Sequence, residues 1–197
     1  MSYAIIGSGA IGAALARQFA RRGLAVRIAN SRGPESLAGL AGELGTSVVP
    51  ATLTDALRAE VVILAVPFGT VPDVVRGVAD WAGRIVVDAT NAIDFPAFTP
   101  KDLGGRLSSE VVADAVPGAR VVKAFNTLPA AVLAKDPHEG GRRVLFLSGN
   151  DAAANAAVAG LIDRLGFAPI DLGPLAAGGR LQQFGSALMV HSLIKQP

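Results

Sequence analysis

The chain has 197 residues, of which 51% are hydrophobic, and its 18 basic and 16 acidic side chains give a formal net charge of +2. This length predicts one domain, and the near balance of scattered charges argues against nucleic-acid binding. The absence of cysteine excludes disulfides, thiolate metal sites and a thiol nucleophile. With only His138 and His191, far apart in the chain, we expect no metal site.

The apolar residues are cut into short runs, such as residues 61–66, although the mean hydropathy is +0.45. None of these runs approaches the ~20 residues that span a bilayer. The first residues lack the basic stretch of a signal peptide, and Gly7 and Gly9 interrupt their apolar run. We therefore expect a cytoplasmic protein with no membrane partner.

Strand-like and helix-like segments alternate through residues 3–59. An apolar run that ends in a glycine turn predicts a strand at 3–9, and the helix predicted at 10–23 stops at a glycine. Pro34 stands at a plausible first position of a second helix, at 34–45. The other segments predicted here are strands at 24–30 and 46–50 and a short helix at 52–59.

The later strands are rich in β-branched residues and are predicted at 60–67, 84–90, 119–125 and 142–149. They are too continuously apolar for a sheet with one wet face, so they suit a parallel sheet covered on both sides. A helix at 150–166 and a strand at 167–173 follow. The pattern predicts an α/β fold, a Rossmann-type doubly wound and mostly parallel sheet, in one domain with a core at 1–173 and a helical tail at 174–197.

The first predicted strand leads into the glycine motif GSGAIG. In this strand–turn–helix context the first glycine permits the tight turn, the second lets the backbone approach a pyrophosphate, and the third lets the helix pack on the sheet. N–H groups at the start of that helix would face the phosphates. The motif predicts dinucleotide binding by Gly7, Ser8, Gly9, Ala10, Ile11 and Gly12. The plainer interpretation is a glycine-rich turn without a ligand.

The end of the second predicted strand lacks the usual acidic residue. A carboxylate there would bond a ribose 2′-hydroxyl and repel a 2′-phosphate, but the chain has Asn30. Ser31 offers a hydroxyl donor, and Arg32 offers a fork of N–H groups that matches a phosphate. These residues predict NADP(H) rather than NAD(H), against the alternative of a solvated loop in which Arg32 has no ligand.

Small polar residues follow three later strands, in the stretches 65–71, 88–94 and 123–129. Ligands of open α/β sheets bind at the carboxyl ends of strands, so we expect these stretches to lie near the nicotinamide. The candidates are Asn91, Phe125, Asn126 and Thr127. The alternative for each stretch is a strand-ending turn, with the phenylalanine in the core.

The chain offers no convincing acid or base for alcohol chemistry. His138 lies in a turn-like stretch, and we expect His191 to be structural, within a C-terminal helix. Tyr3 lies in the first strand, away from the site, and Lys123 is inside a strand and only weakly a candidate base. We therefore assign no catalytic residue. Because hydride transfer to a flavin-like ring needs no such group, this lack weakly favours a flavin or deazaflavin acceptor.

The motifs and their order resemble the NADPH:coenzyme F420 oxidoreductases and the homologous reductase domain of STEAP metalloreductases, over essentially the whole chain. The resemblance rests on the stretches GSGAIG, NSRGPESL, VVILAVPFGTVPDV, VVDATNAI, VVKAFNTLPA and DLGPLAAGGRLQQFG. It implies NADP(H) on the glycine loop, with Ser31 and Arg32 on the 2′-phosphate. The cofactor residues that it implies on the nicotinamide side are Ala65, Val66, Pro67, Ala89 and Asn91.

The same resemblance implies a second substrate site and an assembly. A ring of F420, FMN or FAD would lie near Phe125, Asn126 and Thr127, and the GGRLQQFG segment with Arg180 would close that pocket. The C-terminal segment would contribute to a homodimer contact. The expected activity is hydride transfer between NADPH and this small-molecule acceptor.

Two other functions remain open. One is the reduction of an imine or carbonyl substrate, as in pyrroline-5-carboxylate reductase, although residues 174–197 are too few for the helical domain of that family. The other is a non-catalytic NADP(H) sensor that binds a partner. Oxidation of NADPH stimulated by a flavin would exclude the sensor.

Overall fold

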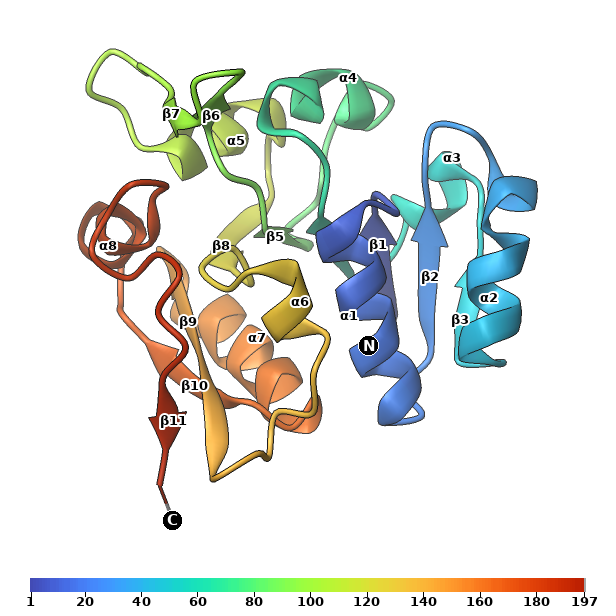
Figure 1. Ribbon diagram of the computed structural model, residues 1–197. Helices are drawn as coiled ribbons and strands as arrows, with labels where there is room; N and C mark the ends of the chain where they lie inside the picture. The colour runs from blue at the N-terminus through green and yellow to red at the C-terminus, as the bar shows by residue number, and fades with distance from the viewer. Residues whose placement is uncertain (197) are drawn as a thin grey trace.

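The computed structural model describes residues 1–196, which build a nine-stranded sheet in the order β10-β9-β8-β5-β4-β1-β2-β3, with β11 paired to β9 (Figure 1). The strands are β1 Tyr3–Ile6, β2 Val26–Ala29, β3 Val48–Pro50, β4 Val61–Leu64, β5 Ile85–Asp88, β8 Arg120–Ala124, β9 Arg142–Gly149, β10 Ala168–Asp171 and β11 Ile194–Lys195. Every strand predicted from the sequence is therefore present in the structure.

Most neighbouring strands run parallel. The strands β3, β2, β1, β4, β5 and β8 form one continuous parallel set. β9 runs antiparallel to β8, β10 is parallel to β9, and β11 is antiparallel to β9. The prediction of a mostly parallel, Rossmann-type sheet is confirmed, and the antiparallel step at β9 is the exception to it.

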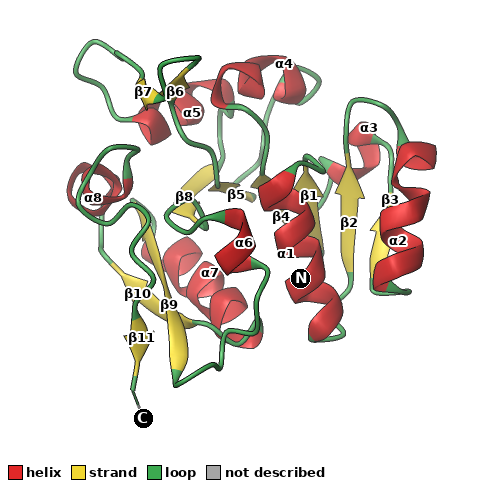
Figure 2. Ribbon diagram, in the orientation of Figure 1, coloured by secondary structure: helices red, strands yellow, loops and turns green. Residues whose placement is uncertain are grey.

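Helices cover both faces of the sheet (Figure 2). One face is covered by α1 Ala10–Arg21, α2 Ala38–Leu44, α6 Ala130–Leu133 and α7 Ala152–Arg164. The other is covered by α3 Leu53–Ala56, α4 Val71–Val75 and α5 Ser108–Ala115. Short turns of helix lie at η1 Pro34–Leu37, η2 Phe68–Thr70, η3 Leu175–Gly179 and α8 Arg180–Gln182. Within residues 1–196, no helix is both long and apolar enough to cross a bilayer.

Each central strand contributes side chains to two separate cores. Ile5 and Ile63 pack with Phe19 of α1 in one core, whereas Ile6 and Leu64 belong to the other. Successive side chains of a strand point to opposite faces, so a strand buried on both sides must be apolar at every position. This explains why the strands read as unbroken apolar runs in the sequence.

The C-terminal tail differs from the predicted helix. Of the described tail residues 174–196, only 175–182 are helical, and the chain then turns back and pairs with β9 as β11. Residue 197 of the predicted tail lies outside the described residues. Gly185 has a φ of +84° and lies tightly against Pro100, so it cannot continue a helix. His191, which we expected in that helix, instead lies exposed in the segment before β11. Leu188 of the tail packs beside β9 and β10, and the Phe184 ring packs against Phe98 of the hairpin described next.

A hairpin that the sequence did not reveal leaves the sheet after β5. It consists of β6 Ile93–Asp94 and β7 Thr99–Pro100, and it is braced by an ion pair of 2.9 Å between Lys101 and Asp94. Figure 1 shows the hairpin beside α8, at the carboxyl-end edge of the sheet. The phenylalanines at 95 and 98 are 72% and 61% exposed. The hairpin and the α8 part of the tail therefore share one end of the molecule, whereas β11 lies toward the other end.

Candidate functional site

A cavity of about 500 Å³ opens at the carboxyl ends of β1, β2 and β4. This is the edge of an open α/β sheet at which ligands bind. The residues predicted from the sequence that line it are Gly7, Ser8, Gly9, Asn30, Ser31, Arg32, Ala65, Val66 and Pro67. Further lining residues that the sequence did not indicate are Ile6, Leu53, Thr70, Asp73 and Val74. Leu53 and Val74 add an apolar wall from α3 and α4, and only the packing of those helices reveals it.

The three glycines of the motif have different surroundings. Gly7 has a φ of +110°, and a Cβ there would overlap the carbonyl oxygen of Ala65. A Cβ on Gly12 would overlap the carbonyl oxygen of Gly7, so helix α1 can approach the loop only with a glycine at this position. A Cβ on Gly9 would meet no atom within 4 Å, because this residue faces the cavity. The space beside Gly9 is therefore available to a ligand that approaches the backbone.

Helix α1 begins at this cavity with its first N–H groups uncapped by any side chain. Gly9 is its N-cap residue, it makes no side-chain bond, and the first turn holds no acidic residue. The N-terminus of a helix of this length carries partial positive charge and free N–H donors, which suit a phosphate. Ala10 and Ile11 supply backbone in that first turn. The cavity thus fits the pyrophosphate of a dinucleotide.

The loop after β2 is organised by the side chain of Asn30. Its Nδ2 donates to the hydroxyl oxygens of Ser8 and Ser36, each at 3.0 Å, and its Oδ1 accepts from the backbone N–H of Arg32 at 2.9 Å. Through these hydrogen bonds the Asn30 amide holds the loop against the glycine motif. Ser31 and Arg32 are exposed, and within residues 1–196 the Arg32 guanidinium takes part in no ion pair. Both side chains remain available to a ligand phosphate.

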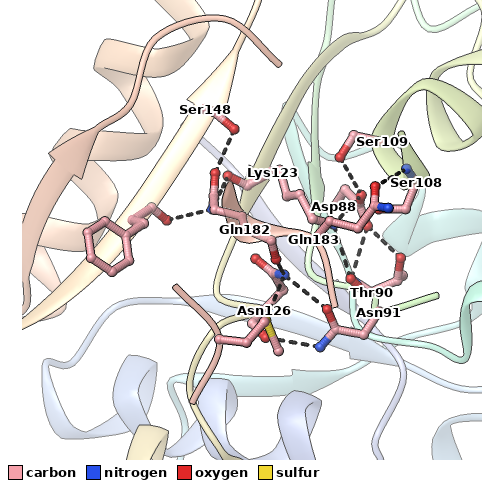
Figure 3. A network of polar contacts seen from close by, with 12 residues as sticks. Asp88, Thr90, Asn91, Ser108, Ser109, Lys123, Asn126, Ser148, Gln182 and Gln183 are labelled. Atoms are coloured by element: carbon pink, nitrogen blue, oxygen red, sulfur yellow. Dashed lines mark hydrogen bonds and ion pairs between the residues drawn. The ribbon is translucent and has the colours of Figure 1, made fainter. Parts of the chain in front are cut away.

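Two asparagines pair where β5 and β8 end (Figure 3). Asn91 Nδ2 donates to the backbone oxygen of Asn126 at 3.0 Å, and Asn126 Nδ2 donates to Asn91 Oδ1, also at 3.0 Å. Asn126 Nδ2 also donates to the backbone oxygen of Gln182 at 2.7 Å. The structure therefore brings together two predicted site residues that are 35 positions apart, and it joins them to the tail.

A buried ion pair between β5 and β8 supports the pair of asparagines. Lys123 Nζ lies 3.0 Å from Asp88 Oδ2, and both side chains are fully buried. Lys123 also donates to the backbone oxygen of Thr90, while Asp88 accepts from Thr90 and from the Ser109 hydroxyl. Lys123 is thus engaged inside the protein and is not placed to act as a base on a ligand. Its contacts fix the Thr90 turn, which leads directly to Asn91.

Gln182 locks the tail onto the sheet, and nothing in its sequence context indicated this role. Its Oε1 accepts from the Ser148 hydroxyl at 2.6 Å, and its Nε2 donates to the backbone oxygens of Lys123 and Phe146 at 3.3 and 3.2 Å. The side chain is fully buried. Figure 3 shows it between the strand ends and Asn126. A buried amide with this many partners fixes the position of the tail segment that carries it.

The other residues predicted on the acceptor side lie differently. The Phe125 ring is fully buried in the apolar core, so it does not offer a face to a ligand. Thr127 is buried, and its backbone oxygen accepts from the N–H of Val190. Ala89 is buried between the strand ends, whereas Arg180 is exposed at the start of α8. Of the predicted acceptor residues, Asn126 is the one in direct contact with Asn91.

The remaining titratable candidates lie away from the cavity. His138 is exposed and its Nδ1 lies 2.9 Å from the Arg22 guanidinium, while the Tyr3 hydroxyl accepts from Arg164. Hydrogen bonds from His138, chiefly from its backbone N–H, lower the pKa of Asp136. Among residues 1–196, no three histidine or acidic side chains gather in a way that could hold a metal ion.

Comparisons with known proteins match this architecture. Residues 2–92 match the family model described as NADP oxidoreductase, coenzyme F420-dependent. A crystal structure of a hypothetical protein, SMa0349, from Sinorhizobium meliloti is 62% identical, with a TM-score of 0.97, and the match covers 99% of this chain and 96% of that one. A structure from Arthrobacter sp. FB24, provisionally named an F420-dependent NADP reductase, is 31% identical, with a TM-score of 0.74, over 89% of this chain and 86% of that one.

The curated relatives are longer proteins. The metalloreductase STEAP3 of Rattus norvegicus is 30% identical over 179 residues, which is 90% of this chain and 35% of the relative. The chain thus spans about a third of the length of this relative. The glycine cavity, the sheet order and the match along nearly the whole Arthrobacter protein all indicate the same family. The chain belongs to the NADP oxidoreductase, coenzyme F420-dependent family, whose members are NADP-dependent oxidoreductases.

Proposed function

We propose that the protein transfers hydride between NADPH and a flavin-like acceptor, which is coenzyme F420 or a flavin. The observation that carries this proposal is the cavity in which the open side of Gly9, the start of α1 and the Ser31–Arg32 loop face one another. The pyrophosphate fits the first two features, and the 2′-phosphate of NADP(H) fits the third.

The nicotinamide end of the cofactor would extend along Ala65, Val66 and Pro67 toward Asn91. When bound, NADPH would supply a hydride from C4 of its nicotinamide ring to the acceptor ring, and solvent would supply the proton that completes the reduced acceptor. The protein's part is to hold two rings in contact and to exclude water. No described side chain has to move a proton in this scheme, which agrees with the positions of Lys123, Tyr3 and the histidines.

The first test is the cofactor preference. We expect NADPH to bind at least tenfold more tightly than NADH, and Arg32→Ala to remove that difference, which corresponds to about 1.4 kcal/mol. Fluorescence titration at fixed salt measures both affinities. Arg27→Ala is the matched control, because Arg27 is an exposed arginine on β2 that does not line the cavity. Equal affinity for both cofactors, unchanged by Arg32→Ala, would contradict the proposed 2′-phosphate site.

The acceptor is tested next, by following NADPH oxidation with F420, FMN, FAD and ferric chelates. Flavin- or F420-dependent oxidation supports the proposed reaction. Tight NADPH binding without turnover on any of these acceptors would instead favour the non-catalytic sensor.

We further propose a homodimer. Phe95, Phe98 and Val190 are 72%, 61% and 65% exposed, and the Phe98 ring packs edge-on against Phe184 of the tail at 5.4 Å. The hairpin and tail thus form one exposed apolar surface. Surfaces of this kind mark contact sites in proteins. A second copy of the chain is the partner that the family resemblance favours.

A further inference from the structure

The side-chain amide of Asn126 has one atom without a partner. Both N–H groups of its Nδ2 are committed, one to Asn91 Oδ1 and one to the backbone oxygen of Gln182. Because a backbone oxygen can only accept, the orientation of the Asn126 amide is fixed. Its Oδ1 is buried and makes no hydrogen bond.

The neighbouring polar side chains, unlike this oxygen, have hydrogen-bond partners. Gln182 beside it uses both ends of its side chain, and Asp88 below accepts from three different residues. A buried acceptor that is left unpaired destabilises the fold, so such an atom in a native protein calls for an explanation. The other buried atoms without partners within residues 1–196 belong to Trp81, Arg143 and Asn155, away from the Asn91–Asn126 pair.

Backbone strain surrounds the same amide. Phe125, directly before Asn126, has a φ of +64°, and Val190 has a φ of +60°. For a β-branched residue such as Val190 this conformation is a clear outlier, and strained residues gather at ligand sites. The backbone N–H of Val190 donates to the backbone oxygen of Thr127 at 2.8 Å, which holds this part of the tail next to Asn126.

Met189 of the tail lies beside the nitrogen of this amide. Its sulfur lies 3.9 Å from Asn126 Nδ2, and its side chain is half-buried. Methionine is unbranched and has three rotatable bonds, so it can turn aside at little cost. A ligand that takes the place of the Met189 side chain would lie against the Asn126 amide.

We propose that Asn126 Oδ1 accepts an N–H from the molecule bound for hydride transfer, after Met189 rotates away. The proposal rests on the proposed function and names a specificity-determining atom within it. With both donors of the Asn126 amide already used, the site selects a ligand that donates. At the two reacting rings of the proposed reaction, two groups carry such an N–H: the primary carboxamide of the nicotinamide, and the imide of a flavin or deazaflavin ring.

Two analogues separate these sources. The 3-acetylpyridine analogue of NADPH keeps the carbonyl oxygen and lacks the amide N–H, and 3-methyllumiflavin lacks the imide N–H of lumiflavin. A site built to bond an N–H strongly rejects a ligand that lacks it. We expect the wild-type protein to bind one of these analogues at least tenfold more weakly than its parent, as measured by cofactor and flavin fluorescence titration.

Variants then assign the discrimination to one atom. Asn126→Leu removes the oxygen, so it should bring each analogue to within about twofold of its parent, even where all affinities fall. A merely structural role for Asn126 would weaken parent and analogue alike and leave their ratio unchanged. Gln183→Ala is the matched control, because the Gln183 side chain accepts from the backbone N–H of Ser108 and makes no hydrogen bond with Asn126 within residues 1–196, and it should keep the wild-type ratio. Thermal melts confirm that each variant folds.

Equal affinity of the wild-type protein for each analogue and its parent would overturn the proposal, as would discrimination that survives in Asn126→Leu. Because the readout is binding, it gives an answer even if no acceptor supports turnover. Absence of NADPH oxidation would count against the proposed reaction alone. A wild-type protein that oxidises NADPH but binds each analogue as tightly as its parent would count against the role of Asn126 alone.

Discussion

Gly9 and Gly12 stand three residues apart and are glycines for opposite reasons. Gly12 is fixed by the protein, because a side chain there would overlap the backbone of Gly7. Gly9 has a φ of −71°, which any residue can adopt, and open space where its side chain would be. The lack of a side chain at Gly9 therefore does not serve packing, and it leaves room only for a ligand that enters the cavity. Position 12 is thus constrained by folding, and position 9 by ligand binding.

This difference predicts opposite outcomes for two alanine substitutions. Gly9→Ala should leave the free energy of unfolding nearly unchanged and weaken NADPH binding at least tenfold, or about 1.4 kcal/mol. Gly12→Ala should destabilise the fold by about 1–3 kcal/mol through overpacking, although alanine is the better helix former. Urea unfolding and NADPH titration on both variants check this. Normal NADPH affinity in Gly9→Ala would show that no ligand approaches the backbone there.

At the scale of elements, the Lys123–Asp88 pair joins β8 to β5 just below the asparagines. A buried charge that loses its partner is far more costly than an exposed one. The hairpin offers a natural contrast in Lys101–Asp94, whose side chains are 46% and 49% exposed at a similar separation. The two lysines make comparable contacts with a carboxylate and differ mainly in burial.

We therefore expect Lys123→Met to lower the free energy of unfolding by about 3–5 kcal/mol. Lys101→Met should cost about 0–1 kcal/mol. Adding Asp88→Asn to Lys123→Met should recover part of the loss, because no uncompensated carboxylate then remains buried. Urea unfolding of the three variants measures these differences. Similar costs for the two single lysine variants would show that burial does not strengthen the inner pair.

The strands could be predicted from the sequence because each apolar run had to satisfy two cores at once. The cavity half of the site followed from the same pattern, since the glycine motif and the NSR stretch each end a strand. The tail was predicted only in part, because residues 175–182 are helical but the chain beyond them turns back and pairs with β9 through backbone contacts that no local pattern encodes. Gln182 escaped prediction because its partners come from β8 and β9, and no local spacing encodes such contacts.

At the scale of the whole molecule, the hairpin and the tail form the exposed apolar end. If a second copy covers this end, replacing Phe95 and Phe98 by serine should shift the protein from dimer to monomer. Sedimentation velocity at several concentrations measures the change. Val49→Ser is a control of the same kind, since Val49 is a 47% exposed apolar residue on the opposite edge strand, β3. A wild-type monomer, or a dimer that persists in the double variant, would contradict this interface.

The cavity beside β1, β2 and β4 and the amide cluster beside β5 and β8 share no side chain. Groups without shared partners respond to substitution nearly independently. If Ser31 and Arg32 hold the 2′-phosphate as proposed, substitutions at these two positions should change the nucleotide preference without disturbing the Asn126 end. A scaffold divided like this is a practical starting point for building new reductases.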